Sequence, residues 1–71
     1  MKQSRDVYDI LSAVMKELAT ELDIHYDDED FFALTPSIVE LQAGVETLQA
    51  EGKPVPDAVN HVIGRYNKAR N

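Results

Sequence analysis

Hydrophobic residues recur at three- and four-residue steps in three stretches of the chain, residues 4–23, 35–52 and 56–69. This spacing gives a helix one apolar side, so each stretch is predicted to form an amphipathic α-helix. The first apolar stripe consists of Val7, Ile10, Leu11, Val14, Leu18 and Leu22, broadened by Met15 and Ala19. The other two stripes consist of Ile38, Leu41, Val45 and Leu48, and of Val59, Val62, Ile63 and Tyr66.

The three apolar sides are expected to meet in one core. The residues predicted to be buried together are Leu11, Val14, Leu18, Leu41, Val45, Leu48, Val59, Val62, Ile63 and Tyr66. A chain of 71 residues is long enough for one domain and too short for two. We therefore assign residues 1–71 to a single helical-bundle domain. Gly44, inside the second stretch, would let a neighbouring helix approach closely.

Residues suited to helix ends flank each stretch. Ser4 is expected to cap the first helix, with Asp6 at the positive end of the helix dipole. Thr35 is expected to be the N-cap of the second helix, followed by Pro36 at its first helical position. Pro56 is expected to occupy the same position in the third helix.

The link between the second and third helices is Glu-Gly-Lys-Pro-Val-Pro, residues 51–56. Gly52 suits the left-handed conformation that ends many helices. Pro54 and Pro56 bias the residues before them towards extended conformations, which stiffens the link. A short, stiff link between two amphipathic helices favours an antiparallel pair. The predicted fold is therefore all-α, a small antiparallel bundle of three main helices.

Four consecutive acidic residues, 27–30, lie between the first two helices and precede two phenylalanines and a leucine. Neighbouring acidic side chains repel one another, yet they are favourable at the N-terminus of a helix. The sequence leaves two structures open. One is a solvated loop whose aromatic residues cover the end of the bundle, and the other is a short helical turn over residues 28–34.

The formal net charge of −6 is unevenly distributed. Residues 1–30 carry nine acidic and three basic side chains, whereas residues 52–71 carry one acidic and four basic side chains. The acidic balance disfavours non-specific binding of nucleic acid. The chain has no cysteine and no apolar run of about 18 residues, and its first residues are polar, unlike a signal peptide. We therefore expect a soluble intracellular protein without a transmembrane span.

No residue pattern indicates catalysis or a bound cofactor. A calcium-binding EF-hand needs glycine at its sixth position, and frames that start at Asp23 or Asp28 lack it. Neither His25 nor His61 belongs to a His-x-x-x-His or a Glu-x-x-His pair, the spacings of helical metal sites. A helix-turn-helix DNA reader is disfavoured because Asp57 falls where such proteins contact bases. We expect no metal, no cofactor and no enzymatic activity.

Two groups of residues are candidates for contacting a partner. The basic group is Arg65, Lys68 and Arg70. The aromatic group is Tyr26, Phe31 and Phe32. The basic group is able to dock on a membrane protein or weakly on anionic lipid head groups, or it simply complements the helix dipole. The aromatic group is able to form a contact surface or to pack over the core, as Tyr66 is expected to do.

One stretch resembles a known family. Residues 48–63 read Leu-Gln-Ala-Glu-Gly-Lys-Pro-Val-Pro-Asp-Ala-Val-Asn-His-Val-Ile, which is similar to the middle of the bacteriocin immunity proteins of the enterocin A, or pediocin-like, type. The resemblance extends over residues 38–68. It implies an antiparallel bundle in the bacterial cytoplasm that protects the producing cell, without catalysis, from its own membrane-active peptide.

The same resemblance implies a partner and a region of recognition. The partner would be the sugar-transport permease that the peptide targets, reached from its cytoplasmic side, and the discriminating residues would lie in the C-terminal half. Two other classes of function stay open at this point. One is a small regulatory or phage-type adaptor that binds another protein, and the other, less favoured, is a DNA-binding module.

Overall fold

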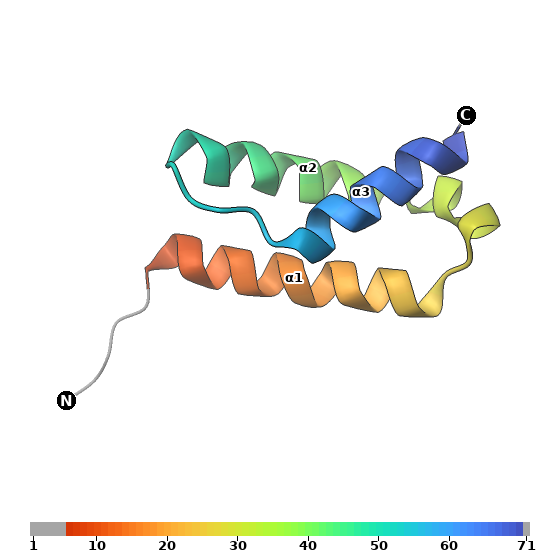
Figure 1. The fold of residues 1–71 in the computed structure, drawn as a ribbon, viewed down its shortest axis with the longest axis horizontal. Helices are drawn as coiled ribbons and strands as arrows, with labels where there is room; N and C mark the ends of the chain where they lie inside the picture. The colour runs from red at the N-terminus through yellow and green to blue at the C-terminus, as the bar shows by residue number, and fades with distance from the viewer. Residues whose placement is uncertain (1–5, 71) are drawn as a thin grey trace.

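The computed structural model describes residues 6–70, which form four helical elements. These elements are α1 (Val7–His25), the 3₁₀ helix η1 (Asp28–Leu34), α2 (Thr35–Ala50) and α3 (Asp57–Arg70). α1 and α2 run antiparallel and are joined through η1 at one end, while α3 lies across both of them (Figure 1). The prediction of an all-α bundle with three main helices is confirmed, and the connection before α2 is a helical turn.

The beginnings of α1 and α2 differ from the predicted caps. Ser4 lies outside the described residues, and the N-cap of α1 is Asp6, whose Oδ1 accepts the backbone N–H of Tyr8 at 2.9 Å. The prediction that Thr35 is an N-cap is wrong, because its backbone is already helical. Since η1 leads directly into α2, the Thr35 hydroxyl instead donates back to the carbonyl of Phe32 at 3.0 Å.

Gly52 ends α2 as the link motif predicts. Its φ angle is 68°, and its N–H donates to the Gln49 carbonyl at 3.0 Å. The next N–H, of Lys53, reaches the Leu48 carbonyl at 2.9 Å, which completes a Schellman motif. Pro56 precedes α3 rather than opening it, and the link runs back along α2, so α3 begins near the middle of the bundle (Figure 1).

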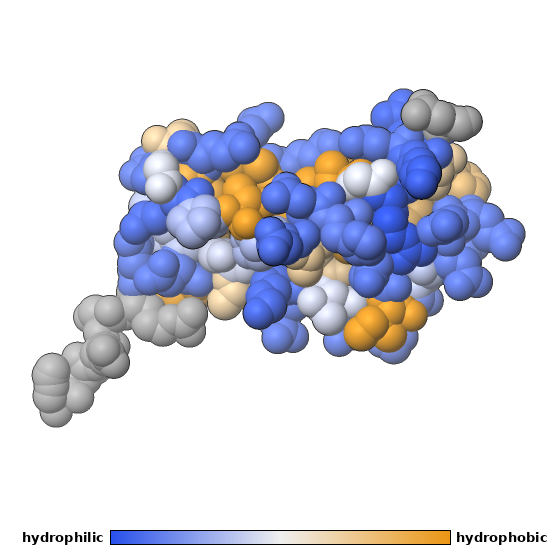
Figure 2. Space-filling view, in the orientation of Figure 1, coloured by the Kyte–Doolittle hydropathy of each residue, from blue (hydrophilic) through white to orange (hydrophobic). Residues whose placement is uncertain are grey.

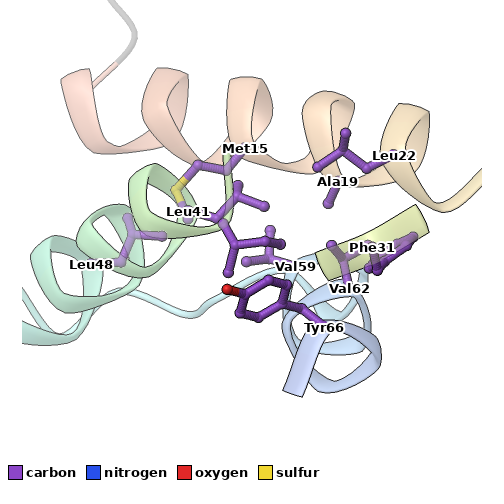
Figure 3. Close-up of a cluster of buried hydrophobic side chains, with 10 residues drawn as sticks. Met15, Ala19, Leu22, Phe31, Leu41, Leu48, Val59, Val62 and Tyr66 are labelled. Atoms are coloured by element: carbon purple, nitrogen blue, oxygen red, sulfur yellow. The ribbon is translucent and has the colours of Figure 1, made fainter. Parts of the chain in front are cut away.

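The core lies where α1, α2, α3 and η1 meet, and its side chains point towards one another (Figure 3). The buried residues are Met15, Ala19, Leu22, Phe31, Ile38, Leu41, Leu48, Val59, Val62 and Tyr66. Three further predicted core residues are partly buried against this cluster, namely Leu11, Val45 and Ile63. Tyr66 belongs to the core, as its position in the third stripe indicates.

The predicted orientation of α1 is wrong by part of a turn. Val14 and Leu18 were expected in the core, but they are 59% and 36% exposed, whereas Met15 and Ala19 are buried. The apolar arc of α1 is wider than the surface that its neighbours cover, so the stripe alone does not fix which edge of the arc packs inwards. Packing of the other helices selects the edge that carries Met15 and Ala19.

Gly44 allows the close approach that its place in α2 suggested. A Cβ atom built on Gly44 would lie 2.5 Å from Sδ of Met15, which is closer than real Cβ contacts. Any larger residue there would therefore displace the methionine side chain. Glycine in mid-helix costs about 1 kcal/mol relative to alanine, and here it makes room for Met15 between α1 and α2.

Among residues 6–70, no helix combines the length and the apolar character that crossing a membrane requires.

Candidate functional site

The basic and aromatic candidate residues lie at the same end of the bundle, where η1 meets the last turns of α3. Apolar and hydrophilic atoms adjoin there on the molecular surface (Figure 2). Lys68 and Arg70 are exposed, and so are Phe32, at 63%, and Tyr26, at 41%. The structure therefore brings together two groups that lie more than 30 residues apart in the sequence.

Arg65 is not a free basic residue, contrary to the prediction of a three-residue docking patch. Its guanidinium donates to the carboxylate Oδ1 atoms of Asp23, at 2.7 Å, and of Asp28, at 2.6 and 2.9 Å. It also donates to the backbone carbonyls of Asp23 and Tyr26 at 3.1 and 3.2 Å. These bonds occupy carbonyls that the end of α1 leaves free, so Arg65 joins α1, η1 and α3.

Phe31 is likewise a structural residue and not a contact residue. Its side chain is fully buried, which corrects its assignment to the aromatic contact group. The guanidinium carbon of Arg65 lies 4.2 Å from the centre of the Phe31 ring, within the range of a cation–π interaction. Phe31 and Arg65 thus form one packed unit beneath the exposed residues of this end.

An open groove of about 590 Å³ lies beside this unit. We call it the end groove, and its lining residues are Phe32, Thr35, Tyr66, Ala69 and Arg70. The Tyr66 and Thr35 hydroxyl oxygens lie 2.7 Å apart, and Tyr66 is the donor because the single Thr35 proton is directed to the Phe32 carbonyl. The Arg70 guanidinium carbon lies 5.6 Å from the centre of the Tyr66 ring.

The remaining candidates lie around the end groove. Lys68 lines a neighbouring hollow together with Asp28, Arg65 and Ala69. Tyr26 is exposed but does not line the end groove. Of the six predicted contact residues, Phe32 and Arg70 line the end groove and Lys68 lies beside it, and all three are exposed. Tyr66 and Thr35 also line the groove.

The Asp23 side chain has two basic neighbours on α3, Arg65 and His61. Hydrogen bonding from Arg65 holds the pKa of the Asp23 carboxyl below its ordinary value, and His61, whose Nε2 lies 3.2 Å from Asp23 Oδ1, adds to the effect. A carboxyl whose pKa is lowered by folding stabilises the fold at neutral pH. That stabilisation is lost as the pH falls through the lowered pKa.

Arg65→Gln is expected to raise the pKa of Asp23, because it removes the hydrogen bonds that favour the carboxylate. The measurement is an NMR titration of side-chain carboxyl signals in the parent and the variant. Asp6 is the matched control, since its pKa is lowered mainly by the Tyr8 N–H and by Lys53, far from Arg65. An Asp23 titration that is unchanged in the variant would contradict the described ion pair.

The described residues offer no group of three or more potential metal ligands. Each histidine is instead near one carboxylate: His25 lies 3.0 Å from Glu21, and His61 lies next to Asp23. In the acidic segment before Phe31, Asp28 is taken up by Arg65, while Glu29 and Asp30 are exposed. What the arrangement of this end can do chemically is recognise a partner through an exposed aromatic ring and an arginine that line one groove, with an exposed lysine in the neighbouring hollow.

Comparisons with protein-family models, with curated proteins and with solved structures found no match to this chain.

Proposed function

We propose that this protein is a non-enzymatic binding protein that protects a bacterial cell from its own membrane-active peptide. In this proposal it acts in the cytoplasm, as the immunity proteins that it resembles do. Its end groove docks on the inner side of a sugar-transport permease. The single observation that carries the docking site is the exposed ring of Phe32, which lines one groove with Arg70 while Lys68 lines the neighbouring hollow.

The end groove has the composition of a small protein-binding site. Aromatic residues, phenylalanine included, and arginine are enriched at protein–protein interfaces relative to the rest of the surface. The Phe32 ring extends from a helical turn that Phe31 and Arg65 fix from below, so binding would order few additional groups. Such a fixed aromatic residue supports recognition by insertion into a pocket of the partner.

Charge supports the orientation of this docking. Lys68 and Arg70 are exposed at the end of a protein whose net charge is −6. An acidic partner surface or anionic lipid head groups would therefore attract this end and repel the rest. Each basic residue near an anionic surface contributes about 1 kcal/mol, so the two orient the protein without anchoring it.

The test is protection of a sensitive bacterial strain that expresses the protein and is challenged with a panel of bacteriocins. We expect the parent chain to protect against at least one peptide. The variant Phe32→Ala/Lys68→Gln/Arg70→Gln should lose that protection while its helicity is retained, because exposed substitutions usually change stability by within about 0.5 kcal/mol. Arg65 is left unchanged, since its guanidinium is bound to Asp23 and Asp28 within the fold.

The matched control is Glu29→Gln/Asp30→Asn, which alters exposed side chains of the same helical turn. It should protect as well as the parent. Full protection by the triple variant would rule out the end groove as the docking site. Absence of protection by the parent against every peptide of the panel would count against the immunity function itself.

A further inference from the structure

α1 exposes a row of apolar side chains that no other part of residues 6–70 covers. Val7, Ile10, Val14 and Leu18 are 65%, 43%, 59% and 36% exposed. Their spacing of three, four and four residues places them along one side of the helix. From Val7 to Leu18 the row is about 17 Å long, since a helix rises about 1.5 Å per residue.

The position of this row follows from the contacts of α1. Met15 packs against Gly44 of α2, and Asp23 binds Arg65 of α3. With about 100° of rotation per residue, Asp23 lies about 80° to one side of Met15. By the same helix geometry, Leu18 and Val14 lie about 60° and about 100° to the other side. The row is therefore next to α2 and turned away from α3.

The neighbouring side of α2 is open as well. Glu40 and Ala43 are exposed, and around the helix they lie about 40° and about 100° from Gly44. They are on the side away from the buried Leu41 and Leu48. We call the surface made by Val14, Leu18, Glu40 and Ala43 the α1/α2 face. It is the side of the helix pair that α3 leaves uncovered.

Acidic residues border this apolar surface on both edges. Glu17 and Glu21 follow the row along α1, each three residues after Val14 or Leu18, and Glu40 stands on the α2 edge. α2 carries no basic residue, and α1 carries one lysine against four acids. A second copy of this chain would bring like charges together, and an anionic membrane would be repelled. The complementary occupant carries positive charge around an apolar stripe.

We propose that the α1/α2 face binds a basic amphipathic helix of a protein partner. Apolar side chains of that helix, repeating at i, i+3 or i+4, and i+7, lie along the row from Val14 to Leu18. Its lysines and arginines face Glu17, Glu21 and Glu40. This surface is separate from the end groove, and the inference does not depend on the proposed immunity function.

The probe is a labelled synthetic helix of about 14 residues, with leucines at the helical anchor spacing and lysines elsewhere. Binding is measured by fluorescence anisotropy and located by NMR shift changes in the full chain. We expect binding with changes centred on α1 and α2. Val14→Gln/Leu18→Gln should weaken binding about tenfold through the lost apolar contact. Glu17→Gln/Glu40→Gln should weaken it mainly at low salt.

Two matched controls should bind the probe as the parent does. They are Phe32→Ala, which alters an exposed apolar residue elsewhere, and Glu29→Gln/Asp30→Asn, which removes two charges from η1. A probe with glutamate in place of lysine should not bind. Equal loss in control and test variants would overturn the proposal. So would self-association, or binding to vesicles of anionic lipid, that Val14→Gln/Leu18→Gln abolishes.

Discussion

Phe31→Ala is expected to lower the free energy of unfolding by about 3–5 kcal/mol, the range for removing a buried aromatic ring. Phe31 is fully buried where η1 closes the end of the core (Figure 3). The guanidinium of Arg65 lies over its ring. For a domain of this size, with roughly 4–11 kcal/mol of total stability, that loss is a large fraction. Chemical denaturation followed by circular dichroism measures it.

Two companion variants make this prediction specific. Phe32→Ala alters the adjacent ring, which is 63% exposed, and should change the unfolding free energy by within about 1 kcal/mol. Phe31→Leu keeps most of the apolar volume and should recover much of the stability. If Phe31→Ala and Phe32→Ala were equally destabilising, the described burial of η1 would be wrong.

The sequence was sufficient for the elements because their signals are local. The three- and four-residue steps predicted three helices, and Gly52 ended α2 as expected. The starts were less certain, because cap residues compete. Asp6 caps α1, and Thr35 forms its hydrogen bonds from within the helix. A 3₁₀ turn that continues directly into α2 removes the need for a capping side chain at Thr35.

The candidate site was only partly predictable, because its decisive contacts are not local. Phe32, Lys68 and Arg70 were found from residue type, and the fold places them at one end. Arg65 has the same residue type, yet it is taken up by Asp23 and Asp28, which lie 42 and 37 positions away. No spacing rule joins residues so far apart, so sequence reasoning could not separate the structural cation from the exposed ones.

The orientation of α1 could not be read from its sequence for a related reason. Its apolar residues cover about half of the helix circumference, counted at about 100° per residue, and the neighbours bury only part of that arc. Met15 fills the narrow space beside Gly44 and Ala19 is buried, whereas Val14 and Leu18 stay at the surface. The sequence thus shows that α1 carries an excess of apolar surface. It does not show which edge of that surface stays exposed.

Leu41→Ala and Leu18→Ala are therefore expected to differ strongly, although both residues belong to apolar stripes. Leu41 is 1% exposed in the centre of the core, and its truncation should cost about 2–5 kcal/mol through lost burial and a residual cavity. Leu18 is 36% exposed, so its truncation should cost less than about 1 kcal/mol. Urea unfolding of the two variants, with the slope compared between them, measures the difference.

The comparison decides between the two orientations of α1. If Leu18 faced the core, as the stripe alone indicates, both variants would be destabilised to a similar extent. A large loss for Leu41→Ala alone places Leu18 at the surface, beside Val14. Double truncation tests the same point, because Leu18→Ala/Leu41→Ala should show additive losses if the two side chains do not share a cavity. Strong non-additivity would instead indicate that Leu18 packs in the core with Leu41, so that the α1/α2 face would lose one of its apolar side chains.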